Sequence, residues 1–281
     1  QKTDLGLDLV PYPQIFNDVN NQKAEVILYR PTGESGDFEK ANFPIGVEGG
    51  KTSTCPTQNL MEAYDMKDGT PFVWNNQSDP YDNRDPRMKY TIVCNEMKWP
   101  VDPVEIWEGG TNGLPLQNAT TTGYYLKKYV NNTISFEAGS TVTKKQHNWV
   151  LFRYGEILLN YAEAMINAFH DPNYKDAVYN MSAREAVNQI RGRTNISLPG
   201  FPSDITEKDF VKRLKNERRV ELAFEGHRFW DVRRWKELGQ TANIYGVKIT
   251  KNNEVISYEK FLLETRAVTD NMYFYPIPNT E

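Results

Sequence analysis

The segment "NERRVELAFEGHRFWDVRRW", residues 216–235, mixes charged side chains with large aromatic ones. When residues 210–235 are plotted at about 100° per residue, the apolar side chains gather on one side of a helix. Three glutamates spaced four residues apart and two arginines fall on that same side: Glu217, Glu221, Glu225, Arg218 and Arg228. Buried ions lose their hydration and are tolerated only in pairs. We therefore predict that these five residues form a buried, structural ion network.

A catalytic site in this segment is the alternative to a structural network. Catalysis would require the carboxylates to face a cleft and to differ in pKa. An ion network requires only that other helices pack over it, so the structural interpretation is favoured. His227 falls on another side of the helix, where a surface or packing role is expected.

Composition excludes several classes of function. The 281 residues carry a net charge of −4, and acidic residues interrupt the basic ones, which argues against nucleic acid as a partner. The most apolar stretch, residues 150–169, contains three charged residues and cannot span a bilayer. Three histidines and two cysteines give no metal cluster, and no catalytic triad or phosphate loop is legible. We expect no enzyme activity, metal or cofactor, and Cys55 and Cys94 are either free or joined in one disulfide.

The chain divides into three parts by composition. Residues 1–22 are expected to be a connector, residues 23–148 a loop-rich region, and residues 149–281 a helical region that makes the fold mainly α. Short strands are predicted at 24–30, 89–97 and 123–130, a short helix at 57–66, and mostly helix over 149–239. The helix that begins at residue 149 carries two apolar stripes, and the next one opens with a capping box at Ser182 and Glu185. Their small contact residues resemble one tetratricopeptide-type helix pair.

The quoted segment resembles the C-terminal signature of SusD/RagB-type proteins. Further passages fit this family in the expected order: "AYDMKDGTPF" (63–72), "YDNRDPRMKYTI" (81–92), "TGYYLKKYV" (122–130), "FRYGEILLNYAEAM" (152–165), "AREAVNQIRGRT" (183–194) and "YFYPIPNTE" (273–281). The resemblance covers nearly everything from residue 24 onward and corresponds to the C-terminal part of such a protein.

The resemblance implies a SusD-like fold and a binding protein that is not an enzyme. Such a protein holds an oligosaccharide at the bacterial cell surface and passes it to a SusC-like, TonB-dependent outer-membrane transporter. It is a lipoprotein of the outer membrane, held by an N-terminal lipid anchor that is not among these residues. Some relatives bind peptides, so peptide uptake in the manner of RagB is the first alternative.

A glycoside hydrolase is the second alternative. Its carboxylate pair would come from Asp79, Asp82 and Asp85 in "QSDPYDNRDPR". Asp, Asn and Pro in such a stretch signal turns more simply, with Asp85 and Arg87 bracing them. The enzyme interpretation is therefore the less favoured one.

Aromatic residues in loop-like sequence are the candidates for ligand binding. Sugar rings stack on aromatic planes beside polar side chains. Two loops offer this combination, and their candidate residues are Trp74, Asn75, Asn76 and Tyr81 in the first loop, and Trp99 and Trp107 in the second. The other tryptophans, Trp149, Trp230 and Trp235, are expected on helices, where packing is the simpler role.

Overall fold

The structure is a computed structural model that describes residues 6–16, 24–75, 79–137 and 143–275. The α-helices are α1 (Asp37–Asn42), α2 (Gln58–Met61), α3 (Pro86–Thr91), α4 (Tyr154–Phe169), α5 (Ala183–Arg191), α6 (Glu207–Glu221) and α7 (Arg228–Arg234). The strands are β1 (Val26–Ser35), β2 (Ile92–Val93), β3 (Tyr125–Leu126), β4 (Lys145–Arg153), β5 (Asn243–Asn252) and β6 (Val255–Thr265). Three 3-10 helices complete the set: η1 (Tyr12–Phe16), η2 (Leu238–Thr241) and η3 (Asp270–Tyr273).

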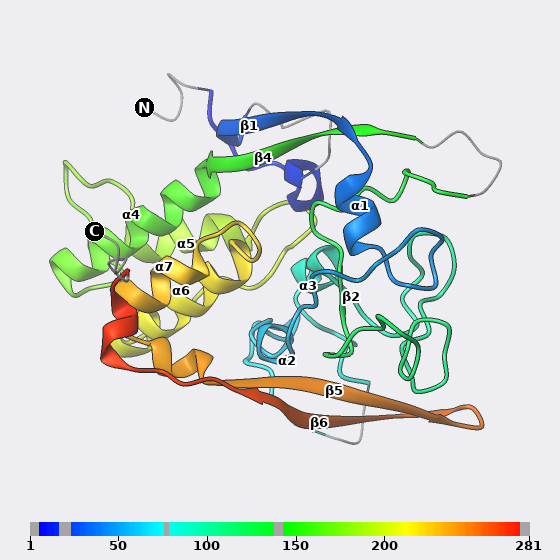
Figure 1. Cartoon of the computed structure of the whole chain (residues 1–281). Coiled ribbons are helices and arrows are strands. Elements are labelled where there is room, and N and C mark those ends of the chain that lie inside the picture. Colours follow the sequence, from blue (N-terminus) through cyan, green and yellow to red (C-terminus); the bar gives the residue numbers. More distant parts are fainter. Residues whose placement is uncertain (1–5, 17–23, 76–78, 138–142, 276–281) are drawn as a thin grey trace, which may run out of the picture.

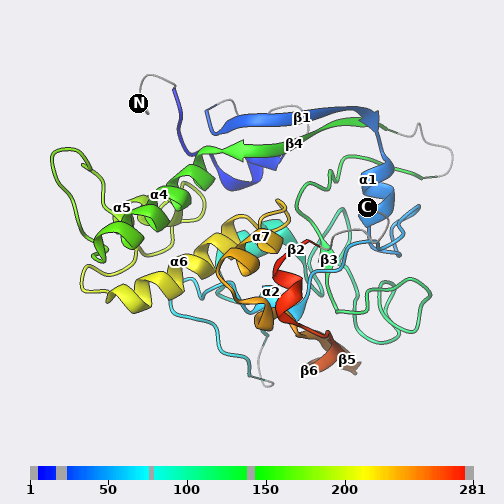
Figure 2. The same ribbon diagram turned by 60° about the vertical axis from the view of Figure 1, so that its left-hand side comes forward.

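Helices and long loops occupy opposite sides of the molecule. Figure 1 shows α4 to α7 on one side, the loops around α3 and β2 on the other, and two long β-ribbons along the edges that join them. The turned view in Figure 2 keeps α4 and α5 apart from the loops. The strands pair only in antiparallel twos within the described residues, as β1–β4, β2–β3 and β5–β6.

The helical side is built on a core shared by α4, α5 and α6. Leu158, Ala162, Ala186 and Phe210 are all almost fully buried within it. Ala162 and Ala186 belong to this core, together with larger residues of the same helices. The expected capping box is present, because the Ser182 hydroxyl accepts from the Glu185 amide while the Glu185 carboxylate accepts from the Ser182 amide.

Several expected elements differ from the ones observed. The helix predicted at 57–66 is only the four-residue α2, which is capped by Thr57, whose hydroxyl accepts from the Leu60 amide. The strand predicted at 89–97 begins as helix α3, because Pro86 stands at its first turn and Asp85 caps it. Residues 149–153, expected to be helical, extend strand β4.

Two larger segments also depart from expectation. Residues 12–16, placed in a connector, form η1, in which Tyr12 and Ile15 have no exposed surface. The long β5–β6 hairpin lies within the region expected to be helical and packs along the loops. Its strands carry β-branched residues such as Val247 and Ile249, which are buried in the larger core.

Helix α6 ends at Glu221, although the sequence pattern was read as one continuous helix to residue 235. Phe224 and Gly226 have φ values of +61° and +85°, so the chain turns before α7 begins at Arg228. Glycine adopts such a φ without the steric cost that a Cβ brings. The break changes which side chains share a face with the three glutamates.

Candidate functional site

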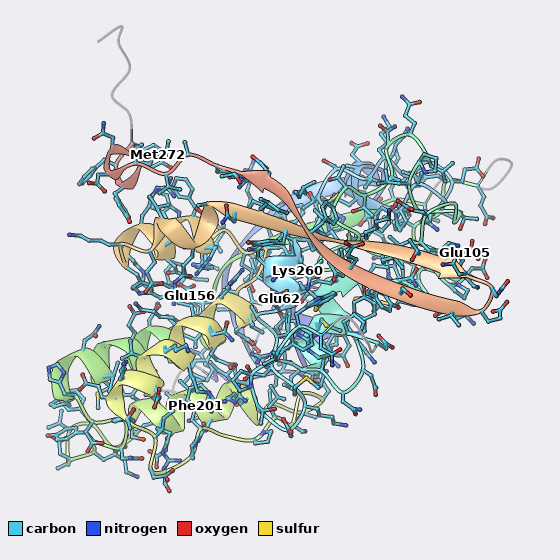
Figure 3. The ribbon with its side chains drawn as sticks, turned by 90° about the horizontal axis from the view of Figure 1, so that it is seen from below. Glu62, Glu105, Glu156, Phe201, Lys260 and Met272 are labelled. Atoms are coloured by element: carbon cyan, nitrogen blue, oxygen red, sulfur yellow. The ribbon has the colours of Figure 1, made fainter. Side chains whose placement is uncertain are left out.

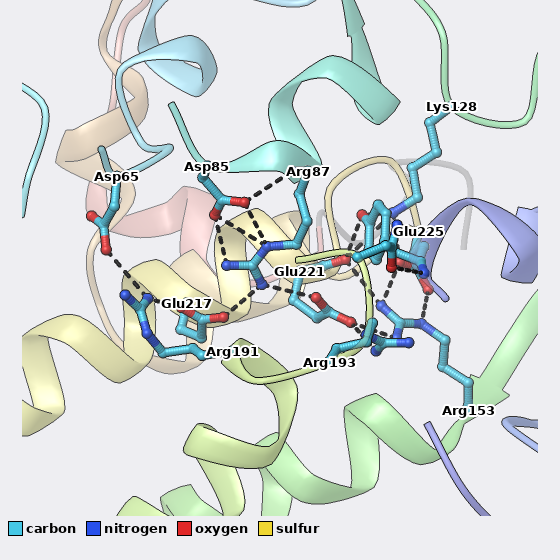
Figure 4. Close-up of polar contacts among 12 residues, drawn as sticks. Asp65, Asp85, Arg87, Lys128, Arg153, Arg191, Arg193, Glu217, Glu221 and Glu225 are labelled. Atoms are coloured by element: carbon cyan, nitrogen blue, oxygen red, sulfur yellow. Dashed lines mark hydrogen bonds and ion pairs between the residues drawn. The ribbon is translucent and has the colours of Figure 1, made fainter. Parts of the chain in front are cut away.

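The three glutamates of the quoted segment lie together in the interior. Glu217 is 3 % exposed, Glu221 is fully buried, and the side chain of Glu225 is 2 % exposed. Figure 4 shows their carboxylates in one line between the helical side and the loop side of the molecule. Five cations from distant parts of the chain surround them: Arg87, Lys128, Arg153, Arg191 and Arg193.

Arg87 links two of the glutamates to the loop-rich half of the chain. Its Nη1 lies 2.6 Å from Glu217 Oε1 and 2.9 Å from Glu221 Oε2, and its Nη2 lies 2.7 Å from Asp85 Oδ2. The other oxygen of Glu217 receives Arg191 Nη1 at 2.7 Å. Because Asp85 is held by Arg87 and is 1 % exposed, it is not available as a catalytic acid.

The far end of the network binds β4 and the N-terminal segment. Arg153 Nη1 and Arg193 Nη2 lie 2.8 and 2.7 Å from Glu221 Oε1, and both arginines also bind Glu25. Glu225 receives Arg153 Nε at 2.7 Å and Lys128 Nζ at 2.7 Å. The network therefore fastens η1, β4, α5 and α6 to the loop side.

The pKa values of these groups show how strongly the ions depend on one another. Burial alone would raise the pKa of Glu221, but Arg193, Arg153 and Arg87 together hold it well below its usual value. The pKa values of Glu217 and Glu225 are lowered in the same way. Burial lowers the pKa of Lys128 to about 8, although Glu225 acts in the opposite direction.

Arg218 and Arg228 lie outside this network, in contrast to the expectation from the sequence. Arg218 Nε binds both oxygens of Asp231 at 2.9 Å, and Arg218 Nη1 donates to Asn160. Arg228 lies beyond the end of α6, and its Nη2 donates to Gln240 Oε1 at 2.9 Å. The plot of residues 210–235 assumed one continuous helix. It therefore placed Arg228 on the same face as the glutamates, although the chain turns at Gly226.

The aromatic candidates fall into two groups. Tyr81 and Trp99 are 6 % and 4 % exposed, and their rings make edge contacts with Tyr124 and Phe43 respectively. Neither ring offers an open face to a ligand. Trp74 and Trp107 are half-buried, and Asn75 is exposed. Asn76 lies outside the described residues.

Two of the remaining tryptophans, Trp149 and Trp230, also differ from expectation. Trp149 lies on β4 rather than on a helix, and its ring stacks on His147. Trp230, expected to pack inside, is 54 % exposed on α7. Trp235 Nε1 donates to Glu163 at 2.8 Å at the end of the same helix. His227 is half-buried, and its Nε2 lies 3.7 Å from Glu156 Oε2. Both observations are consistent with a packing role.

A wide groove opens among the loops, with a volume of about 920 Å³. We call it the loop groove. Its walls are residues 46–48, 99–105, 111–112 and 132–137. Among the sequence candidates that the structure describes, only Trp99 contributes to its lining, and Trp107 lies on the loop directly after the 99–105 wall. Glu105 lies beside the far part of the β5–β6 hairpin, whereas Glu156 and Phe201 lie among the helices (Figure 3).

Hydrogen bonds connect neighbouring walls of the groove. Asn112 Oδ1 accepts from the Gly46 amide at 2.8 Å, and the Asn112 carbonyl accepts from the Tyr125 hydroxyl at 2.5 Å. Glu105 accepts from the Thr111 hydroxyl at 3.1 Å. A side chain at position 46 would collide with Asn112, so glycine is required there. These bonds connect the 46–48, 99–105 and 111–112 walls of the groove to one another.

The polar side chains of the loop groove suit a ligand rich in hydroxyl groups. Its lining contains amide, hydroxyl and carboxylate groups that can donate to or accept from a sugar, in Glu48, Asp102, Glu105, Asn132, Thr133 and Ser135. Sequence reasoning missed Asn132 and Thr133, because they follow the predicted strand 123–130 and no binding role was assigned to the residues after it. The density of Asn and Thr in the run "YVNNTIS", beside the Trp99 loop, was the available signal.

Metal and membrane features are not found among the described residues. No three His, Cys, Asp or Glu side chains there are grouped so as to hold a metal ion. None of the described helices is both long and apolar enough to cross a bilayer. Cys55 and Cys94 are not joined, and Cys94 lies in the core.

Comparison with known proteins places this fold in a family. The sequence profile of the SusD family matches residues 15–281. The chain therefore belongs to the SusD family, which confirms the resemblance found in its sequence motifs. SusD-like protein P38 of Formosa agariphila is 37 % identical over 91 residues, which are 30 % of this chain and 16 % of P38.

Solved structures show the same fold. A SusD-like protein from Bacteroides fragilis is 26 % identical and superposes with a TM-score of 0.78, over 99 % of this chain and 57 % of that one. Another protein from Bacteroides fragilis, described as a SusD-like carbohydrate binding protein, is 23 % identical with a TM-score of 0.79 over the same shares. The chain thus spans a little over half the length of these relatives.

Proposed function

We propose that this protein binds a glycan in the loop groove and does not cleave it. The observation that carries the proposal is the groove of about 920 Å³, lined by sugar-compatible polar groups, in a member of the SusD family. One structural relative is described as carbohydrate binding, which supports the same ligand class. The proposed setting is the surface of a bacterial outer membrane, where a lipid-anchored protein passes the glycan to a SusC-like transporter. In that setting α4 and α5 would be one tetratricopeptide-like pair of the fold.

Trp107 is proposed as a stacking surface at the edge of the loop groove, and Trp74 as a separate stacking surface on the first candidate loop. Trp107 follows the 99–105 wall, and the Lys251 ammonium lies 4.5 Å from the centre of its ring. Trp74 lies on the first candidate loop beside the exposed Asn75, with its ring 6.4 Å from that of Phe72. Half-buried rings of this kind are anchored at one edge and present the other to a ligand.

The alternative carboxylate pair of a hydrolase gains no support from the geometry. Asp79 accepts from the Tyr81 amide and so forms a turn, and Asp82 binds the neighbouring Asn83. Asp85, as described above, is neutralised by Arg87. These contacts match the turn-forming roles that the sequence suggested.

The test is to measure retention of the purified protein in gels that contain single polysaccharides, together with product analysis of soluble oligosaccharides after incubation. The proposal expects retardation by at least one glycan and recovery of that glycan at its original length. Shortened products would show a hydrolase. Binding of peptides without binding of any glycan would favour the RagB-like alternative.

A further inference from the structure

A second hollow of about 480 Å³ adjoins the loop groove. We call it the basic pocket. Trp99, Asn132 and Thr133 line both hollows, so a ligand can continue from one into the other. The charges of the two linings are opposite. Among the residues that the structure describes, the basic pocket is lined by four lysines and no carboxylate, whereas the loop groove is lined by carboxylates and no lysine or arginine.

The four lysines are not equivalent. Lys128 is fully buried and forms an ion pair with Glu225, so its charge is balanced within the ion network. Lys145 extends from β4, and Lys98 is exposed at the start of the 99–105 wall. Lys127 is half-buried, and its Nζ lies 3.6 Å from Met97 Sδ.

Lys127 is the group whose surroundings point to a missing partner. In the described part of the chain its ammonium makes no ion pair with a carboxylate. Burial lowers the pKa of Lys127, which shows that the charged form is poorly solvated where it stands. A half-buried cation among other cations is stabilised when an anion binds beside it.

We propose that the basic pocket binds an anionic substituent, a carboxylate or a sulfate ester, of the glycan whose neutral part lies in the loop groove. This inference rests on the proposed function and narrows its substrate class to acidic glycans. The carboxylate-rich groove accepts sugar hydroxyl protons, while Lys127 and Lys98 receive the negative group at the far side of Trp99. Because the two hollows carry opposite charges, the glycan can bind in one direction only, with its anionic group in the basic pocket and its neutral part in the loop groove.

The test is calorimetric titration with D-glucuronate, D-glucose 6-sulfate, inorganic sulfate and neutral D-glucose at one fixed ionic strength. At least one charged sugar should bind with about tenfold or greater advantage over glucose, as expected for a charge-assisted hydrogen bond. Which charged sugar binds distinguishes a carboxylate subsite from a sulfate subsite. Equal binding of all sugars, or inorganic sulfate binding as tightly as the sugar sulfate, would overturn the proposal.

The variants Lys127→Met and Lys98→Met assign the binding to the pocket. Each should remove most of the advantage of the charged sugar, and Lys127→Met should fold at least as stably as the parent because it replaces a poorly solvated ion by an apolar chain beside Met97. The control is Lys260→Met, which removes a half-buried lysine that is paired with Glu62 away from the pocket. If Lys127→Met keeps the full advantage of the charged sugar, the inference fails.

Failure of this inference can be separated from failure of the proposed function. If a glycan is retained through the loop groove but Lys127→Met and Lys260→Met bind it alike, glycan binding in the groove is supported and the anionic subsite is refuted. If charged monosaccharides bind through Lys127 but no polysaccharide is retained, anion binding in the basic pocket is supported and the glycan-binding proposal is refuted.

Discussion

Arg87 and Glu221 bind each other at 2.9 Å although 134 residues separate them in the sequence. Arg87 belongs to α3 in the loop-rich part, and Glu221 is the last residue of α6 in the helical part. The pair fastens the side that carries the loop groove to the helical side. Glu221 also binds Arg153 and Arg193, so one carboxylate contacts three guanidinium groups.

Glu221→Ala should cost about 3–5 kcal/mol of unfolding free energy, because it leaves buried arginines without their partner. Urea unfolding followed by circular dichroism measures the loss. The matched control is Glu108→Ala, which breaks an exposed pair with Lys248 and should cost no more than about 1 kcal/mol. Similar losses for the two variants would contradict a structural role for the network.

Acid should destabilise the protein through the same carboxylates. The folded pKa values of Glu217, Glu221 and Glu225 lie below the ordinary value of 4.5. Their contribution to stability is therefore complete above pH 4.5 and is lost as the pH falls toward the folded pKa values. Unfolding free energy measured from neutral to acidic pH should fall below this point, and less steeply in Glu221→Gln. An unchanged slope in that variant would show that other groups govern acid unfolding.

Sequence patterns predicted the local structure of this network but not its pairings. The four-residue spacing of the glutamates placed them on one apolar face, and both Glu217 and Glu221 are buried there. Their partners Arg87 and Arg153 come from other elements. The pattern within residues 216–235 therefore cannot predict these long-range contacts. The turn at Gly226 was missed because a helical wheel assumes a continuous helix.

The loop groove was predictable only in part for a similar reason. The Pro- and Trp-containing stretch from residue 98 to 110 was predicted to be a ligand loop, and residues 99–105 form one groove wall. Whether an aromatic side chain in a loop faces solvent or core depends on its tertiary neighbours. Trp99 packs against Phe43, more than 50 residues away, and no local signal reveals that contact.

Trp99→Ala and Trp107→Ala should separate packing from binding. Trp99 is almost fully buried, so its truncation should cost about 3–5 kcal/mol of unfolding free energy. Trp107→Ala should cost about 1 kcal/mol, as a partly exposed change does, and should weaken glycan retention. Thermal unfolding and gel retention of the same preparations provide both values. A stable Trp99→Ala protein would contradict the placement of this ring in the core.

Gly226→Ala should be destabilising by about 1 kcal/mol because its φ of +85° disfavours any residue with a Cβ. Nothing lies within 4 Å of the position that the new Cβ would take, so the cost is one of backbone conformation and not of collision. Gly239→Ala is the control, since its surroundings are equally open and its φ is not in the left-handed region. Equal stability of the two variants in urea would contradict the turn that ends α6.

The loop groove is the central claim, and gel retention of Asn132→Ala tests it most directly. Asn132 is exposed and lines both hollows, so its removal should leave stability unchanged while it weakens retention by a glycan that the parent protein binds. Asn252→Ala, an exposed change at the end of β5, serves as the control and should bind like the parent. Our account predicts about a fivefold or greater loss for Asn132→Ala alone, the equivalent of one hydrogen bond. Equal retention of the parent and both variants would contradict the assignment of the groove as the glycan site.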